Sequence, residues 1–150
     1  RPERRTILPD TKYNDLSVAK FINYIMESGK KGVAEKIFYS AMDLIHKKTK
    51  TDGIKIFIKG IENTSPSVEV KSRRIGGATY QVPIEVPKKR AFYLASLWII
   101  NASSNSSGKP MSEKLASELI AAANGDGNAI KKKEDTHRMA DANKAFAHFR

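Results

Sequence analysis

The stretch from Val68 to Arg90 decides how this chain is organised, and it reads Val-Glu-Val-Lys-Ser-Arg-Arg-Ile-Gly-Gly-Ala-Thr-Tyr-Gln-Val-Pro-Ile-Glu-Val-Pro-Lys-Lys-Arg. Apolar and polar residues alternate on both sides of the Gly-Gly pair, which is the two-residue period of β-strands. Gly76 and Gly77 can supply the positive φ angles that a tight reversal requires. The stretch therefore predicts a two-stranded β-hairpin from about Val68 to Val86.

Each predicted strand has an apolar and a polar face. In the first strand the valines point one way and the charged residues the other: Val68 and Val70 against Glu69, Lys71 and Arg73. In the second, an apolar set alternates with a mostly polar one: Tyr80, Val82, Ile84 and Val86 against Thr79, Gln81, Pro83 and Glu85. A lone two-stranded hairpin is marginally stable in water, so this one is expected to dock on helices, on a partner or on both.

The hairpin stretch is also strongly basic, because it holds six basic residues and only two acidic ones, a net charge of +4. Arginines near the tip and Tyr80 just past the turn suit contacts with phosphates and stacking on bases. The alternative is a solvated hairpin whose basic residues only provide solubility. The link between basic patches and nucleic acid favours the first interpretation.

The whole chain shares this positive charge. Its 150 residues include 27 Lys and Arg against 16 Asp and Glu, a net charge of +11, which favours a polyanionic partner. Nucleic acid is favoured over a membrane surface because no apolar run approaches the ~20 residues that a membrane span needs. Cysteine is absent, which excludes disulfides, thiolate metal sites and cysteine nucleophiles.

The chain divides into an arm and one domain. Residues 1–13 show no periodicity and carry basic side chains around two prolines: Arg1, Arg4, Arg5 and Lys12. We expect a basic arm that stays disordered until it meets a partner. Residues 14–150 are long enough to bury a core, and we expect a single helical domain into which the hairpin is inserted.

Apolar residues at helical spacing predict helices over about residues 15–27, 32–48, 91–100 and 112–124. Residues 54–61 fit both a strand and a helix, and a short helix between Asp52 and Asn63 is favoured. The helix after Pro87 is apolar nearly all round, which predicts that Trp98 belongs to the core. Residues 101–110 are rich in Ser, Asn and Gly and are expected to be a linker.

A last helix is expected from about Asn128 to Arg150. Residues at intervals of three and four form an apolar stripe that is expected to pack: Met139, Ala142, Phe146 and Phe149. Basic and imidazole side chains line up on the opposite side, where we expect solvent: Lys133, His137, Lys144 and His148. An ordinary solvated face explains this second set at least as well as a binding face.

Sequence signatures of catalysis are missing. The chain contains no nucleophile elbow, P-loop, dinucleotide fingerprint or His-Glu-x-x-His pattern. Its three histidines have no carboxylate at a spacing that suggests a metal site. We therefore expect neither an enzyme nor a cofactor.

Two segments together resemble a known family. One is the hairpin, residues 68–86, and the other, residues 131–149, reads Lys-Lys-Lys-Glu-Asp-Thr-His-Arg-Met-Ala-Asp-Ala-Asn-Lys-Ala-Phe-Ala-His-Phe. In this order they closely resemble the bacterial-type ribosomal protein S-seven family of the small subunit. The likeness covers nearly the whole chain, including Ile-Leu-Pro-Asp at residues 7–10 and the lysine pair at residues 30–31.

The resemblance implies a mainly α, six-helix domain with a protruding hairpin, and it implies that residues 54–61 are helical. It also implies a structural constituent of the small ribosomal subunit that binds the 3′ major domain of the rRNA and nucleates assembly of the head. The hairpin would lie near the exit-site tRNA and the mRNA exit channel, with the neighbouring protein S-eleven across that channel. The expected location is the ribosome, of the cytoplasm or of an organelle.

On this interpretation the basic side chains become the predicted rRNA contacts: Arg4, Arg5, Lys12, Lys30, Lys31, Lys71, Arg73, Arg74, Lys88, Lys89, Arg90, Lys131, Lys132, Lys133, His137 and Arg138. The hairpin tip would face the exit site with Ile75, Gly76, Gly77, Ala78, Thr79 and Tyr80. A DNA-binding regulator would instead need a helix-turn-helix with base-reading residues, which no segment offers. A membrane-surface protein would need a large apolar face on an exposed basic helix, whereas the apolar stripes here look committed to the core.

Overall fold

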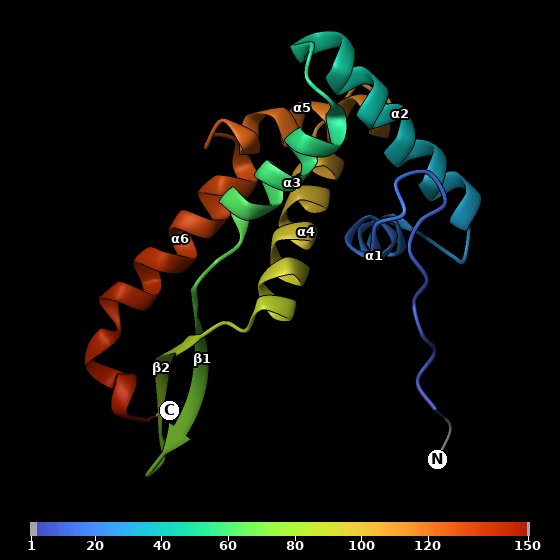
Figure 1. The fold of residues 1–150 in the computed structure, drawn as a ribbon. Coiled ribbons are helices and arrows are strands. Elements are labelled where there is room, and N and C mark those ends of the chain that lie inside the picture. The colour runs from blue at the N-terminus through green and yellow to red at the C-terminus, as the bar shows by residue number, and fades with distance from the viewer. Residues whose placement is uncertain (1–2, 150) are drawn as a thin grey trace.

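The computed structural model describes residues 3–149, and Figure 1 shows a body of α-helices from which a β-hairpin projects. In chain order the elements are α1 (Leu16–Ile25), α2 (Lys31–Thr49), α3 (Gly53–Thr64), β1 (Val68–Ile75), β2 (Ala78–Glu85), α4 (Lys88–Asn105), α5 (Met111–Ala123), α6 (Asn128–Ala142) and the 3-10 helix η1 (Lys144–Phe149). This confirms the predicted mainly α class, six helices with an inserted two-stranded hairpin. Within residues 3–149, no helix combines the length and the apolar character needed to cross a membrane.

The core lies where α1, α2, α3 and α5 meet, with α4 packed against them. Phenylalanine rings from three helices, Phe21, Phe38 and Phe57, form its centre, and each is at most 1 % exposed. The Phe57 ring centroid lies 5.0 Å from that of Phe21 and 5.2 Å from that of Phe38, in edge-to-face arrangements that aromatic pairs favour. These contacts fix the helices that carry the hairpin.

The ambiguous residues 54–61 are helical, as predicted. The Asp52 carboxylate accepts a hydrogen bond from the Ile54 amide at 3.2 Å and caps the start of α3. Helical spacing then buries Phe57 and Ile61 and leaves Ile58 on the surface. The alternating isoleucines therefore come from a helix that is buried on one side only.

Helix α4 is longer than predicted, because it continues through residues 101–105, which were expected to be linker. The Ser103 hydroxyl donates to the Ile99 carbonyl oxygen at 2.7 Å, so this buried serine is satisfied within the helix. Trp98 lies half-buried beside the core and not inside it. The fully buried side of α4 is formed mainly by small residues such as Ala95, and the bulky Trp98 lies at its edge.

The hairpin turn is the predicted one. Strands β1 and β2 pair antiparallel with Ile75 opposite Ala78, which leaves Gly76 and Gly77 as a two-residue turn. The φ angles of these glycines are +57° and +85°, and two consecutive positive values favour glycine strongly. The Gly-Gly pair therefore sets the register of both strands.

This register puts the apolar residues of the two strands on opposite faces of the hairpin. Lys71 is opposite Val82 and Arg73 is opposite Tyr80, and directly paired residues share a face. The charged face of β1 is thus the apolar face of β2, and it is packed, because Glu69 is 7 % exposed and Val82 is fully buried. A buried carboxylate needs a partner, which the neighbouring helix supplies.

The last helix differs from the prediction in its length and in its orientation. It ends at Ala142 and is followed by η1, and residue 150 lies outside the described residues. Met139, expected to pack, is 55 % exposed, and Ala142 is exposed as well. Lys133 and His137, expected in solvent, lie half-buried on the side that faces α3 and β1. Both side chains have apolar parts that can pack while their polar ends form hydrogen bonds.

The N-terminal arm forms no helix or strand over residues 3–9. Arg4 and Arg5 are exposed, and Arg1 lies outside the described residues. The arm joins the body at Asp10, which is only 8 % exposed. The end of the arm is therefore fixed to the helical body.

Candidate nucleic-acid interface

Most of the predicted rRNA contacts are free to meet a ligand. Eleven of the sixteen are exposed and form no ion pair within residues 3–149: Arg4, Arg5, Lys12, Lys30, Lys31, Arg73, Arg74, Lys88, Lys89, Lys131 and Lys132. The arm and the hairpin, which carry five of them, extend toward the same side of the helical body, the lower side in Figure 1. These side chains can neutralise phosphates without breaking an ion pair of the fold.

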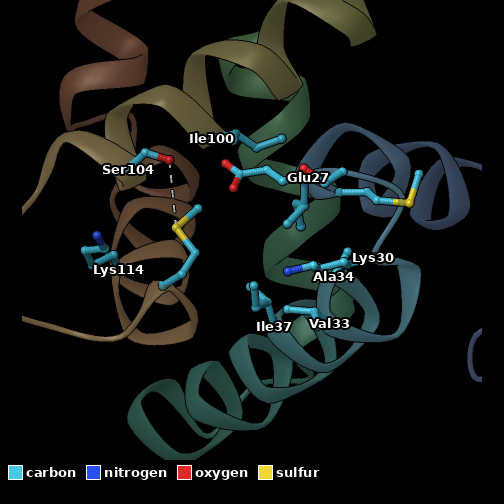
Figure 2. Close-up of a pocket in the computed structure, with 12 residues that line it drawn as sticks. Glu27, Lys30, Val33, Ala34, Ile37, Ile100, Ser104 and Lys114 are labelled. Atoms are coloured by element: carbon cyan, nitrogen blue, oxygen red, sulfur yellow. Dashed lines mark hydrogen bonds between the residues drawn. The ribbon is translucent and has the colours of Figure 1, made fainter.

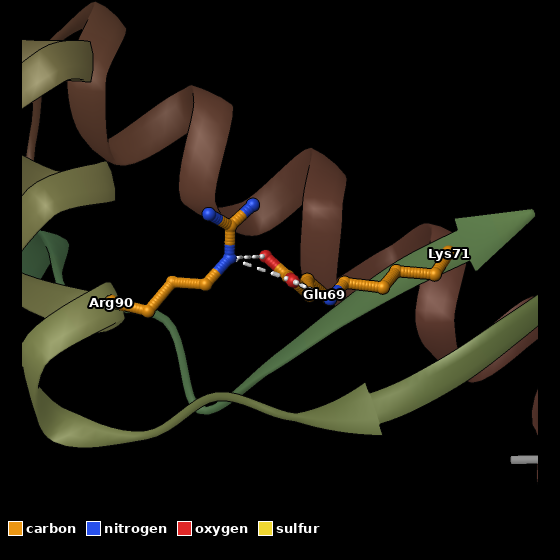
Figure 3. Close-up of polar contacts among 3 residues, drawn as sticks. All are labelled: Glu69, Lys71 and Arg90. Atoms are coloured by element: carbon orange, nitrogen blue, oxygen red, sulfur yellow. Dashed lines mark hydrogen bonds and ion pairs between the residues drawn. The ribbon is translucent and has the colours of Figure 1, made fainter. Parts of the chain in front are cut away.

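Arg90 and Lys71 share the buried carboxylate of Glu69 (Figure 3). The Arg90 Nε donates to the two carboxylate oxygens at 2.9 and 3.1 Å, and the Lys71 Nζ lies 4.0 Å from one of them. The Glu69 side chain is 9 % exposed, whereas that of Arg90 is 45 % exposed. Arg90 therefore ties the start of α4 to β1, and its two terminal nitrogens point away from Glu69 in Figure 3.

Two of the predicted contacts on α6 are bonded inside the fold. The Lys133 Nζ donates to the Asn63 carbonyl oxygen at 2.7 Å, and the Ser67 amide donates to the His137 Nε2 at 3.1 Å. Burial, and then the charge of Lys133, lowers the pKa of His137, so a neutral imidazole accepts this hydrogen bond at neutral pH. Arg138 differs from both, because it is exposed and pairs with Asp135 one turn away, at 3.1 Å.

Asp10 anchors the arm through four hydrogen bonds. Its carboxylate accepts from the amides of Lys12, Tyr13 and Asp15 and from the Tyr39 hydroxyl, at 2.8 to 3.1 Å. Burial alone would raise the pKa of Asp10, but these hydrogen bonds together lower it. The prediction from sequence missed this anchor, although a Pro-Asp pair before polar residues is a turn signal that could have indicated it.

The hairpin tip is exposed over residues 75–79, but the Tyr80 side chain is half-buried against other rings. Its ring centroid lies 5.2 Å from that of Phe146 and 4.8 Å from that of Phe149. We call these three rings the C-terminal aromatic cluster. Because the cluster covers Tyr80, this residue braces the hairpin against η1 and is not a free surface for stacking on a base.

Lys30 stands beside a groove of about 440 Å³ between the end of α1, the start of α2 and the facing ends of α4 and α5 (Figure 2). Aliphatic side chains such as Val33 and Ile100 line most of it. Across the groove, the Lys114 Nζ donates to the Ser106 carbonyl oxygen at 3.0 Å and secures the loop before α5. Lys30 and Lys31 lie at the N-terminus of α2, where the helix dipole adds to their positive potential.

The histidines do not assemble a metal centre. Within residues 3–149, no three His, Asp or Glu side chains are grouped so that they could hold a metal ion. His137 is bonded to Ser67, and the His46 Nδ1 lies 3.3 Å from the Thr51 carbonyl oxygen. Two of the three histidines thus make polar contacts inside the fold.

Comparison with known proteins agrees with this geometry. A model of the family described as Ribosomal protein S7p/S5e matches residues 1–144. The chain is 57 % identical over 147 residues to the small ribosomal subunit protein uS7 of Gemmatimonas aurantiaca, covering 98 % of this chain and 94 % of that protein. It is 56 % identical over 150 residues to the uS7 protein of Thermotoga maritima, covering 100 % and 97 %, and 52 % identical to that of Novosphingobium aromaticivorans, covering 100 % and 96 %. The chain therefore belongs to the ribosomal protein S7p/S5e family.

Proposed function

We propose that this protein is a structural, non-enzymatic constituent of the small ribosomal subunit that binds the 3′ major domain of its rRNA and nucleates assembly of the head. The observation that carries the proposal is the near-full-length match to uS7 proteins, which are named as proteins of the small ribosomal subunit. Its partners are then rRNA and neighbouring ribosomal proteins, and its location is the ribosome.

The charge distribution supports rRNA as the main ligand. The eleven exposed basic residues come from the arm, the start of α2, the hairpin with the start of α4, and the start of α6. A multi-helix RNA junction presents phosphates at many angles, which suits cations spread over several elements better than a single basic helix does. Recognition is then largely of RNA shape and backbone.

The hairpin and α6 have different tasks in this proposal. The exposed tip, residues 75–79, reaches toward the exit-site tRNA and the mRNA exit channel, across which the protein S-eleven lies. Lys88, Lys89, Lys131 and Lys132 anchor the rRNA together with the arm. The exposure of the tip supports this division, because the helical core does not depend on it.

A filter-binding titration with a transcript of the 3′ major domain tests the proposal, with tRNA and duplex DNA as competitors of equal charge. If roughly five to eight phosphates are neutralised, log K against log salt should slope between about −4 and −7, and the transcript should outcompete both other ligands. A slope shallower than about −1, or equal binding of the competitors, would refute the proposal.

A further inference from the structure

Two aromatic side chains outside the predicted contacts are exposed: Tyr24 of α1 and Tyr93 of α4. They are 37 % and 38 % exposed, whereas each of the other ten Phe, Tyr and Trp side chains, all within residues 3–149, is buried or half-buried. Single exposed apolar side chains are common on protein surfaces, and what distinguishes these two tyrosines is that their rings lie together.

The two tyrosines form a fixed pair. Their ring centroids are 5.4 Å apart with the ring planes at 76°, and the Phe92 ring lies 6.3 Å from that of Tyr24. Because the rings come from different helices of a packed body, this edge-to-face contact holds both in place before any ligand arrives. We call the pair the tyrosine platform.

Each tyrosine of the platform has a lysine one helical turn before it. Lys20 precedes Tyr24 in α1 and Lys89 precedes Tyr93 in α4, both at a spacing of four residues. Residues four apart lie on the same side of a helix, so each lysine stands on the side of its helix that carries the tyrosine. Lys89 is exposed and Lys20 is half-buried. Neither lysine forms an ion pair with another described residue.

We propose that the tyrosine platform stacks on one unpaired base of the bound RNA, with Lys20 and Lys89 contacting the phosphates on either side. Aromatic side chains flanked by cations are the usual means of holding a single-stranded base. The cations favour RNA over an apolar protein segment as the occupant. The inference rests on the proposed function and adds to its backbone contacts one contact that reads an unstacked nucleotide.

Filter binding of the full chain to the 3′ major-domain transcript tests the platform. Replacing Tyr24 or Tyr93 with alanine should weaken binding about tenfold, because stacking on one base is worth that much. The salt slope should stay unchanged, since stacking releases no counterions, whereas Lys89→Ala should reduce the slope by about one. Tyr24→Phe and Tyr93→Phe keep a ring and should bind like the wild type.

Three controls separate the explanations. Ile58→Ala removes a 43 % exposed apolar side chain from α3 and should leave binding unchanged. Tyr24→Leu and Tyr93→Leu keep apolar bulk for the fold but lack the ring, so they should bind as weakly as the alanine variants. If the leucine variants bound like the wild type, the proposal that the tyrosine platform stacks on a base would be overturned, while the proposed rRNA binding would be unaffected. A wild-type chain that does not prefer the transcript over duplex DNA would instead overturn the proposed function.

Discussion

Replacing Arg90 with alanine should destabilise the protein even without RNA, because it leaves the Glu69 carboxylate without its main partner. A hydrogen bond to a charged group contributes about 1.5–3 kcal/mol, and Arg90 donates to both oxygens of a side chain that is 9 % exposed. Arg90 is itself 45 % exposed, so solvent screens the pair, and Lys71 at 4.0 Å recovers part of the loss. We expect the free energy of unfolding to fall by about 1–2 kcal/mol, which lowers Tm by about 2–8 °C.

Urea and thermal unfolding of the RNA-free chain measure this loss. Lys89→Ala is the matched control, because it removes the neighbouring exposed cation and should leave Tm unchanged while it weakens rRNA binding. Adding Glu69→Gln to Arg90→Ala should cost less than the sum of the two single changes, as expected for residues in contact. If the Arg90→Ala variant had the same urea and thermal midpoints as the wild type, the reasoning would be refuted. Arg90 would then be a candidate phosphate contact like the other exposed basic residues.

Three further predictions concern the tip, the start of α6 and the arm. Deleting residues 75–79 and closing the hairpin with Asn-Gly should leave the core folded and assembly nearly intact, because the tip is exposed. Changing Lys131 and Lys132 together to alanine should weaken rRNA binding by about 1–2 kcal/mol for each phosphate that is no longer neutralised. Both variants can be compared in one reconstitution assay. If the tip deletion abolished assembly and the lysine change had no effect, the hairpin tip would be the main rRNA anchor. The pKa of Asp10 lies below its ordinary value of 3.8 in the folded chain, so its stabilising effect is present above about pH 4 and is lost as the pH falls through the folded pKa. Asp10→Asn should therefore lower Tm at pH 7 and flatten the acid side of the stability curve, and an equal loss at pH 7 and pH 3 would contradict this.

Local signals predicted the elements well because each depends on neighbours in sequence. The Gly-Gly turn needed only two positive φ angles. Residues 54–61 were less clear, because their pattern fits both a strand and a helix, and it was the family resemblance that implied the helix seen as α3. The faces of α6 could not be predicted in this way. Lys133 turns inward because its Nζ reaches a carbonyl oxygen of Asn63, and His137 does so because of Ser67, both 70 residues away in sequence.

The candidate site shows the same limit. The exposed cations could be identified from residue type and local pattern, because a charged side chain in solvent needs no partner from a distant part of the chain. They include Arg73, Arg74, Lys131 and Lys132. Arg90 could not be separated from them, because only the strand register reveals that Glu69 is buried beside it. Trp98 was placed in the core for a related reason, since periodicity does not show how wide the packed side of α4 is.

The C-terminal aromatic cluster determines when the hairpin becomes packed against η1 during synthesis, as well as where it packs. Tyr80 leaves the translating ribosome well before Phe146 and Phe149, with 64 residues made between Glu85 and the last of these rings. At a synthesis rate of about 5–20 residues per second, about 3–13 s pass between completion of the hairpin strands and synthesis of the last ring that packs on Tyr80. During that interval its basic strands are already complete but lack their support from η1. We therefore expect a nascent chain to hold its hairpin firmly only after synthesis has passed Phe149, seconds after the residues of the two strands are made.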